Sequence, residues 1–468
     1  MSAPTTSAVV YTTLSAKARA MLAVLCAVLF LDALDVSMKG VALPDTGAAL
    51  GMSTSTLQWV ITGYVVGYGG FVLLGGRVVD LLGRRRMLLS ALAVYVAASA
   101  VGGAADSGAL LLAARFVSGV SAAISAPAAF SIITTGFAAG PARNRALSIF
   151  TATGASGLAL GLVAGGLLTE VHWRLTYLAP AAFGLLALVA GVFLLPRSAP
   201  VPVAARRFDV GGALTITAAM LLAVYTLVEA PNAGWLSART LLSFAAVALL
   251  VVAFVAIERR VAAPLVRLGL LRSGALVRVA VGAMSLLGPW IGVLFLVTIY
   301  LQEHRGWSAL ETGLAVAPVG VVGAILSPVL APPLVGRFGP PRLILAGQLT
   351  AVAAYLLLQF LGPQTSYASV LLPAFVLIGV AFTLAYGPLT MAAAGAVDAE
   401  DQGLAGGVVN TAFQLGAALG LSAVTAAYAA GAGDAAMDGL RPALVVPLVI
   451  AVIGALAALR GVQRARTA

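Results

Sequence analysis

The chain is poor in the residues from which soluble enzymes build reactive centres. It has one cysteine, Cys26, and two histidines in 468 residues, and only 9% of its residues are charged. One cysteine cannot form a disulfide within the chain, and a thiol or imidazole metal site needs several such ligands close together. Scarce charge leaves too little polar surface for a soluble domain. The composition therefore argues against a metalloenzyme, a disulfide-stabilised secreted protein and a soluble globular protein.

Long apolar runs take the place of these residues. Apolar residues make up 61% of the chain, and stretches long enough to cross a bilayer recur from end to end. The first run is too long for a cleavable signal peptide. The 52 glycines fit helices that approach one another closely. We expect an all-α polytopic membrane protein with fourteen spans, at 20–43, 57–76, 87–105, 109–131, 146–169, 175–195, 210–229, 240–257, 276–301, 310–335, 342–361, 368–392, 403–430 and 441–459.

Positive charges indicate how these spans are oriented. Most Lys and Arg residues fall in loops on the side of the N-terminus, and four fall on the other side: Arg174, Arg239, Arg305 and Arg441. The positive-inside rule then places both termini in the cytoplasm of a bacterial cell membrane. The net charge of +11 is spread over these inner loops. Nucleic-acid binding needs a concentrated basic face, so we expect no nucleic-acid partner. We expect a monomer whose only large partner is the lipid bilayer.

The chain also resembles itself weakly. The loop after the second span, 83–89, is similar to the loop after the tenth, 339–345. Duplicated halves around a central site are a recurring plan of transporters. We expect an N-terminal six-helix bundle (1–196), a linker with two additional spans (197–272) and a C-terminal six-helix bundle (273–468).

The first span carries three charged residues, Asp32, Asp35 and Lys39. At i, i+3 and i+7 they share one face of a helix. A charge in the bilayer centre costs roughly 2.5–3.5 kcal/mol even on insertion scales, so these side chains must face protein or water. Lys39 could snorkel to the interface or serve as the counter-ion of Asp35, and Asp32 could be a neutral carboxyl or a partner of Lys39.

Arg115 lies deep in the fourth span. An arginine at that depth needs a partner, and Asp35 is the best one available. A carboxyl that alternates between a dry cavity and a nearby cation binds and releases a proton with conformation. We therefore expect proton coupling at Asp35, Asp32, Arg115 and Lys39.

The loop after the second span contains Gly76, Asp80, Gly83, Arg84 and Arg85. A tight turn with topology-setting arginines explains everything except Asp80, since an acid opposes the inside rule. The pattern G-x-x-x-D-x-x-G-R-R resembles the signature loop of the major facilitator superfamily. That resemblance implies that Asp80, Arg84 and Arg85 act as a cytoplasmic latch between conformations.

Further stretches are similar to the fourteen-span drug:proton antiporters of that superfamily. They are 34–37 with 41–44, 57–64, Arg115 with Gly119, Trp173 with Arg174, 300–302 and 403–420. The resemblance implies two six-helix bundles, two additional central helices and alternating access to a central cavity.

The fifth span carries a stripe of glycines at Gly157, Gly161, Gly165 and Gly166. Such a stripe lets helices pack closely, and packing alone explains it. It also resembles the antiporter motif of the family, with Leu162 in place of a proline.

The charged residues of the spans limit the net charge expected of a substrate. The C-terminal spans hold no carboxylate away from their edges, and Lys39 is expected near the outer mouth. We therefore expect a neutral, anionic or zwitterionic amphiphile. Candidate cavity residues, many of which could instead form interhelical hydrogen bonds or core packing, are Gln58, Tyr64, Tyr68, Trp290, Tyr300, Gln302, Tyr386, Asn410 and Gln414.

The leading hypothesis is a multidrug or antibiotic exporter driven by the proton-motive force, with protons as the coupling ion and no other cofactor. A symporter that imports a metabolite keeps the fold and reverses the flux. A membrane receptor is disfavoured by the short loops. An enzyme is not expected, because no catalytic set of His, Cys and Ser is present.

Overall fold

The computed structural model describes residues 11–467 apart from 139–140, 197–208, 235, 262–268, 270–272, 398–401 and 432–437. Within this part of the chain the secondary structure is helical, with a single isolated bridge between Tyr11 and Phe137. The helices of the first half are α1 (Ala16–Val41), α2 (Leu43–Leu50), α3 (Thr54–Leu57), α4 (Trp59–Leu82), α5 (Arg84–Ala104), α6 (Gly108–Gly136), α7 (Pro141–Val171) and α8 (Leu175–Leu194).

Two helices follow, and then a second group begins. The two are α9 (Val210–Ala233) and α10 (Ala238–Glu258). The second group comprises α12 (Gly274–Ile299), the π-helical turn η2 (Tyr300–His304), α13 (Ala309–Val316), α14 (Pro318–Phe338), α15 (Pro340–Leu357), the 3-10 turn η3 (Leu358–Phe360), the π-helical turn η4 (Tyr367–Leu371), α16 (Leu372–Ala394), α17 (Gln402–Ala430) and α18 (Leu440–Thr467).

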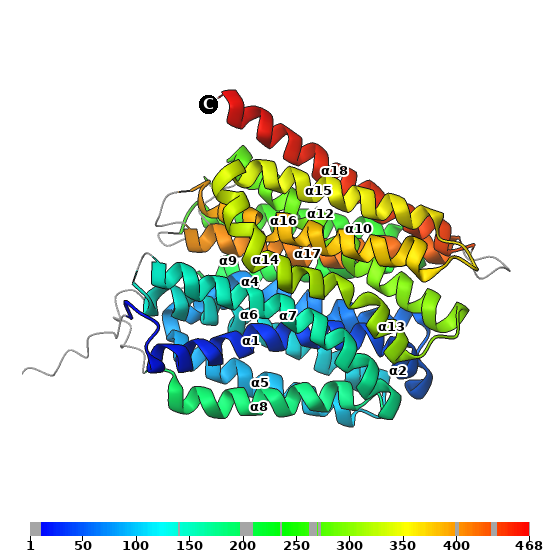
Figure 1. Ribbon diagram of the computed structural model, residues 1–468, viewed down its shortest axis with the longest axis horizontal. Coiled ribbons are helices and arrows are strands. Elements are labelled where there is room, and N and C mark those ends of the chain that lie inside the picture. Colours follow the sequence, from blue (N-terminus) through cyan, green and yellow to red (C-terminus); the bar gives the residue numbers. More distant parts are fainter. Residues whose placement is uncertain are drawn as a thin grey trace, which may run out of the picture.

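The helices pack as two bundles, one above the other in Figure 1. In the N bundle (α1 to α8), α1 packs on α7 and α8, α4 on α6, and α5 on α6 and α8. In the C bundle (α12 to α18), α12 packs on α17 and α18, α14 on α16, and α15 on α16 and α18. The same pairs recur in the same order, so the internal repeat seen in the sequence is a repeat of packing.

Two glycines make the repeated turn possible. Gly83 ends α4 and begins α5 with a φ of 96°, and Gly339 ends α14 and begins α15 with a φ of 74°. Side chains with a Cβ rarely adopt this conformation. Each glycine therefore lets a long helix reverse within one residue at the same place in its bundle.

Helices occupy all fourteen segments predicted as spans. Eleven of them, counted over the described residues, are long and apolar enough to cross a membrane. Three have shorter apolar cores, at Trp59–Val72, Ser156–Val171 and Gly211–Ala223. The chain is a multi-pass helical membrane protein, and a count of fourteen crossings stays a prediction. The predicted domain boundaries also stay predictions, because residues 197 and 272 lie outside the described part of the chain.

The additional helices α9 and α10 pack on one another beside the bundles. α9 contacts both α4 and α17, and Thr217 donates a hydrogen bond to the carbonyl of Gly70 at 2.9 Å. α10 exposes large apolar side chains, among them Leu242 (71%) and Leu249 (69%). Exposure of this kind suits a helix that faces lipid.

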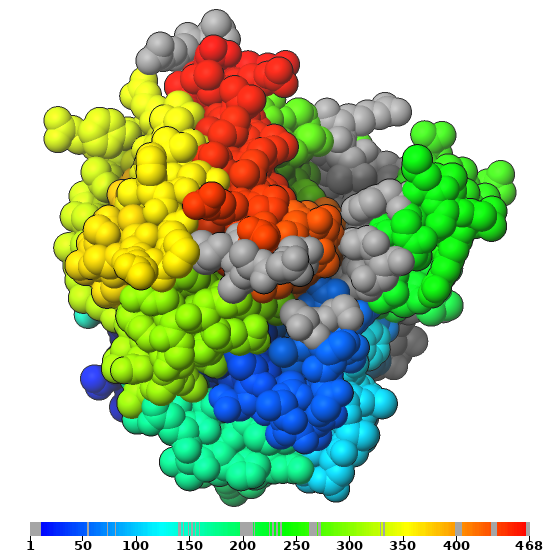
Figure 2. All heavy atoms as spheres, turned by 90° about the vertical axis from the view of Figure 1, so that its right-hand side faces the viewer, coloured from blue at the N-terminus to red at the C-terminus, as the bar shows by residue number. Residues whose placement is uncertain are grey.

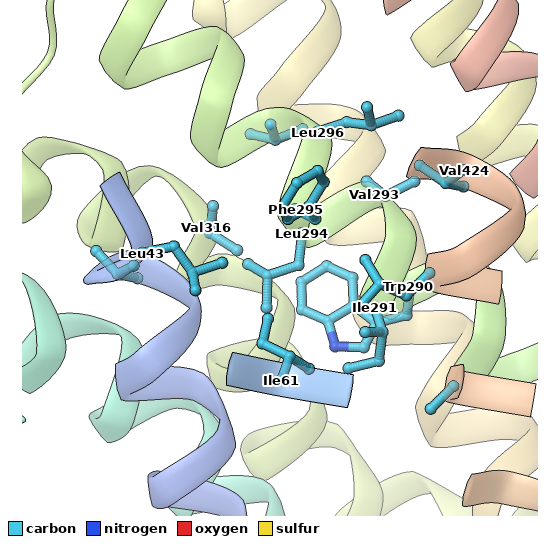
Figure 3. Packing of buried hydrophobic residues seen from close by; sticks show 14 of the residues in the cluster. Leu43, Ile61, Trp290, Ile291, Val293, Leu294, Phe295, Leu296, Val316 and Val424 are labelled. Carbon is cyan, nitrogen blue, oxygen red and sulfur yellow. The ribbon is translucent and has the colours of Figure 1, made fainter. Parts of the chain in front are cut away.

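The two ends of the molecule differ in how the bundles meet. α1 begins and α18 ends at one end, here called the proximal end, whereas α2 and α13 lie at the opposite, distal end (Figure 1). In the distal half one apolar core runs through both bundles. Figure 3 shows Ile61 of α4 against Trp290, Ile291 and Leu294 of α12.

The proximal half contains two separate cores. One comprises residues of the N bundle such as Met21, Leu88 and Ile133, and the other comprises residues of the C bundle. Figure 2 looks onto the distal end, where the yellow-green segment around α13 lies against the blue start of the N bundle. Among the described residues, one apolar core thus joins the bundles in the distal half, and each bundle has its own core in the proximal half.

Candidate transport site

Close packing of α1 on α7 positions the charged face of α1. A Cβ added at Gly157 would lie 2.5 Å from the carbonyl oxygen of Phe30, and one at Gly161 would lie 2.8 Å from that of Leu34. A Cβ at Gly165 would lie 2.7 Å from the Cα of Met38. These glycines therefore bring the α1 backbone against α7, and the charged face turns toward α4, α5 and α6.

Asp35 lies at the centre of a buried ion cluster. It is fully buried, and its Oδ1 accepts hydrogen bonds from the Lys39 ammonium and, at 2.6 Å, from the Tyr95 hydroxyl. Its Oδ2 accepts a hydrogen bond from Arg115 Nη1 at 2.5 Å. The structure thus brings Asp35, Lys39 and Arg115 together, and both carboxylate oxygens have charged partners.

Aromatic rings and a carbonyl surround the two cations. Lys39 Nζ lies 4.8 Å from the centroid of the Tyr177 ring, and the Arg115 guanidinium lies 4.7 Å from that of Tyr64. Such placement stabilises a desolvated cation. Arg115 Nε also donates to the carbonyl of Val60 at 2.8 Å, while its buried Nη2 has no partner among the described residues. The cluster is therefore buried, and loss of the carboxylate would leave two cations uncompensated.

Asp32 has a different environment, one helical turn closer to the proximal end. It is half-buried, and the Tyr64 hydroxyl donates a hydrogen bond to its Oδ1. No described residue donates a hydrogen bond to its Oδ2. Lys39 contacts Asp35 rather than Asp32. Among the described residues, Asp32 therefore has one acceptor oxygen bonded to α4 and one without a donor.

Four of the candidate cavity residues lie in the closed distal half. Thr425 donates a hydrogen bond to Gln58 Oε1 at 2.5 Å, which links α17 to the start of α4. Gln302 Nε2 donates to the carbonyl of Val41 at 3.0 Å. The other two candidates, Trp290 and Tyr300, are buried in the apolar core. In this conformation these four residues connect the two bundles, or fill the apolar core that they share at the distal end, rather than line a cavity. We call this distal contact between the bundles the junction.

The remaining candidates meet halfway along the bundles. Asn410 Nδ2 donates to the Tyr68 hydroxyl at 3.2 Å across the bundle boundary. A Cβ at Gly69 would lie 3.2 Å from the Cβ of Gln414. Tyr386 is 39% exposed and stacks on Phe413 with ring centroids 4.7 Å apart. These residues form a part-exposed polar and aromatic surface beside Asp32.

The loop after α4 makes its described contacts within the N bundle. Arg84 Nη1 donates to Thr135 Oγ1 at 2.9 Å, and Arg85 donates to the carbonyl of Leu195 at 3.1 Å. A Cβ at Gly76 would meet nothing within 4 Å. The side chain of Asp80 lies outside the described residues. Open space at Gly76 agrees with bundles that are separate at the proximal end.

The last glycine of the α7 stripe serves the contact between bundles. A Cβ at Gly166 would lie 2.6 Å from the Cα of Leu310 in α13, and one at Gly313 would lie 2.3 Å from the carbonyl oxygen of Leu162. α7 is continuous through Leu162, where the family motif has proline. The stripe therefore joins α7 to α1 on one side and to α13 on the other.

Sequence reasoning missed several aromatic partners. Tyr95 and Tyr177 complete the ion cluster, and Phe382 and Phe413 flank Tyr386. Tyr95 carries a usable signal, because a hydroxyl within an apolar span needs a hydrogen-bond partner, and it donates to Asp35. Tyr177 contributes its ring alone, since its hydroxyl has no hydrogen-bond partner among the described residues. The phenylalanines carry none, since any apolar helix contains such residues.

A duplicated helical unit, bundles joined at one end and a buried ion cluster beside the junction together define a two-bundle membrane transporter. The chain belongs to the Major Facilitator Superfamily, whose family model matches residues 25–421. Members of this superfamily are transporters, so the chain is not an enzyme.

Relatives and solved structures agree with this family. The chain is 38% identical to the puromycin resistance protein of Streptomyces alboniger, over 92% of this chain and 88% of that protein. It is 35% identical to the cephamycin export protein of Amycolatopsis lactamdurans, over 85% and 82%. The crystal structure of the POT family transporter PepTSo matches with a TM-score of 0.68 at 16% identity, over 96% of this chain and 98% of that one. The last likeness shows the fold alone.

Proposed function

We propose that this chain is a drug:proton antiporter of the fourteen-span type, which exports an antibiotic-like amphiphile by alternating access. The observation that carries the proposal is Asp35, a fully buried carboxylate held by Lys39 and Arg115 beside the junction of the bundles. An ion cluster is costly within a membrane-spanning bundle and is expected where ions or protons move. Relatives named for antibiotic resistance and export support the direction of transport.

In this proposal the proton is the coupling ion and no other cofactor takes part. Both termini are cytoplasmic, as the distribution of arginines favours. The distal end then faces outward, and the structure corresponds to the conformation that is closed to the outside. Opening that end requires the distal junction to separate, including the bonds between Gln58 and Thr425 and between Val41 and Gln302.

We propose a neutral or zwitterionic amphiphile as the substrate. Lys39 is buried on Asp35, so its charge is not free to bind an anion. The C bundle offers no buried carboxylate for a second positive charge within its described residues, because Glu303 and Glu311 are exposed at the distal end. An apolar surface with few polar groups suits such a compound.

Two measurements test this function. A drug-susceptibility panel in an efflux-deficient bacterial host compares the intact protein with Asp35→Asn at equal membrane abundance. We expect the intact protein alone to raise resistance to some compounds. Uptake into inside-out vesicles should then require a pH gradient and release protons. Uptake that is independent of the gradient, or higher sensitivity with the intact protein, would contradict export by antiport.

A further inference from the structure

We propose that Arg278 of α12 and Arg464 of α18 form a binding site for the headgroup of an anionic phospholipid. The site lies at the proximal end of the C bundle, where α12 begins and α18 ends. α18 runs along the edge of that bundle that is remote from the N bundle (Figure 1). A lipid can bind here whatever the substrate and the direction of transport, so the inference goes beyond the proposed function and does not rest on it.

The two guanidinium groups converge on one glycine at the start of α12. A Cβ added at Gly274 would lie 3.3 Å from Nη1 of Arg278 and 3.4 Å from Nη1 of Arg464. One added at Gly461 of α18 would lie 3.8 Å from Nε of Arg278. Arg278 forms no ion pair with a described residue. Like charges this close repel one another, so an anion that binds between the two arginines would stabilise the arrangement.

The first turn of α12 adds backbone donors at the same place. Ser273 caps the helix and accepts a hydrogen bond from the N–H of Leu276 at 3.5 Å. The N–H groups of Gly274 and Ala275 come before the first helical hydrogen bond, and no described residue accepts from them. A helix start favours an anion, and the forked guanidinium of arginine suits phosphate oxygens. Together these donors suit the two free oxygens of a phosphodiester.

An exposed apolar stripe on α18 leads to this site. Val449, Ile453 and Leu456 are each about half exposed (51%, 51% and 56%). The same face of the helix continues to Arg460 and Arg464. Ile453 precedes Arg464 by about 16 Å along the helix axis, which is close to half of the ~30 Å hydrocarbon core of a bilayer. An acyl chain on the stripe would therefore span one leaflet while its phosphate lies at Arg464.

The position and the charge of the site select the ligand. A free phosphate would need the arginines alone, whereas a lipid also uses the apolar stripe that ends beside them. No described carboxylate pairs with Arg278 and could hold the ammonium of a zwitterionic headgroup. In the proposed orientation the proximal end is cytoplasmic, where basic pockets between transmembrane helices hold anionic headgroups. Phosphatidylglycerol, with a phosphodiester and no amine, fits these features.

Lipid binding to the purified protein in detergent tests the site without substrate or gradient. The probe is palmitoyl-oleoyl phosphatidylglycerol, compared with phosphatidylcholine of the same acyl chains. We expect native mass spectrometry to show phosphatidylglycerol bound about tenfold more tightly than phosphatidylcholine. Arg278→Gln should weaken the binding of phosphatidylglycerol about tenfold, as for a lost charge-assisted hydrogen bond. Adding Arg464→Gln should weaken it further and remove the preference for phosphatidylglycerol.

Matched variants separate this site from net charge and from folding. Arg337→Gln removes one charge from an exposed arginine at the proximal end of α14, which lies against the Phe338 ring, and should leave binding unchanged. Arg278→Lys keeps the charge without the fork and should retain part of the affinity. Gly274→Val keeps both arginines but fills the space between them, so it should weaken binding about as much as Arg278→Gln. Thermal unfolding without added lipid shows that each variant is folded.

Equal binding of the two lipids by the wild type, or unchanged binding of phosphatidylglycerol by the folded double variant, would overturn the inference. An equal loss in Arg337→Gln would overturn it too, because net charge alone would then attract the lipid. Protection from thermal unfolding by millimolar inorganic phosphate, to the same extent as by phosphatidylglycerol, would assign the site to a free anion instead. Failure of the wild type to export any compound, with lipid binding intact, would overturn the proposed function and leave this site standing.

Discussion

The two bundles share one packing scheme but divide the chemistry between them. In the N bundle, α1 carries Asp32, Asp35 and Lys39 and is held in place by Arg115 and Tyr95. Its counterpart in the repeat, α12, is buried from Gly288 to Ile299 and carries no charged residue there. Both helices pack on a glycine-rich partner, α7 or α17.

The duplication therefore fixes which helices pack on one another, but the side chains on their inner faces differ between the two bundles. The N bundle carries the buried carboxylate Asp35, and the C bundle carries the stacked rings of Tyr386 and Phe413. The hydrogen bond from Asn410 to Tyr68 joins the two bundles halfway along their length.

The largest effect is expected from removing the carboxylate that balances the two buried cations of the N bundle. Asp35→Asn leaves Lys39 and Arg115 buried without a counter-charge, which costs about 3–5 kcal/mol. We expect gradient-driven transport to be abolished while the protein remains in the membrane, as proteoliposome uptake and thermal unfolding would show. Adding Lys39→Met should recover part of the stability but no transport. Normal uptake by the single variant would refute the assignment.

Matched glycines test whether the two bundles tolerate the same change differently. A Cβ at Gly119 would lie 2.0 Å from the carbonyl of Tyr64, and one at Gly379 would lie 2.7 Å from that of Val319. Overpacking of this kind typically costs about 1–3 kcal/mol, so both Gly119→Ala and Gly379→Ala should lower the unfolding temperature. Only Gly119→Ala should also reduce transport at a temperature where both proteins are folded, because it displaces Tyr64. Equal loss of transport would show that the division between bundles is wrong.

A smaller effect is expected at the junction of the bundles. Thr425→Val removes the hydrogen bond to Gln58, worth about 1 kcal/mol. The conformation closed at the distal end should become about fivefold less favoured relative to the alternative. Distances between spin labels placed at the distal ends of α7 and α14 would report the shift. Thr383→Val is the control, because the hydrogen bond of Thr383 among the described residues is to Gly379 of its own helix. An equal shift in both variants would show that the hydrogen bond between Thr425 and Gln58 does not favour the conformation closed at the distal end.

The smallest effect is expected where charge is exposed. Arg174 pairs with Asp106 at 2.9 Å, and the Asp106 side chain is 91% exposed. Exposed pairs contribute little, so Asp106→Asn should leave both the unfolding temperature and transport unchanged. A large loss in either measurement would show that the effect of a charge depends on the bundle that carries it and not on how deeply it is buried.

The sequence predicts the helices of this protein well because each apolar run must be long enough for the bilayer. It also predicts the pairing of Asp35 with Arg115, since a buried guanidinium has few possible partners. It does not predict the rotation of each helix. Lys39 is a counter-ion of Asp35 as expected, but it is fully buried instead of lying near the outer mouth. Trp290 and Tyr300 lie in the core rather than beside Tyr386. Depth along a helix follows from residue number, but the neighbour that a side chain meets depends on how the helices pack.

The helix α9 sets how the bundles can move. It touches both α4 and α17, but Thr217 bonds to Gly70 of α4, and no hydrogen bond joins the described residues of α9 and α17. Among the described residues, α9 can therefore shift along α17 without breaking a hydrogen bond, but not along α4. If the bundles rock as proposed, we expect α9 and α10 to move with the N bundle, because α9 is bonded to α4 and packs on α10. The two additional helices would then keep an apolar contact with α17 in both conformations.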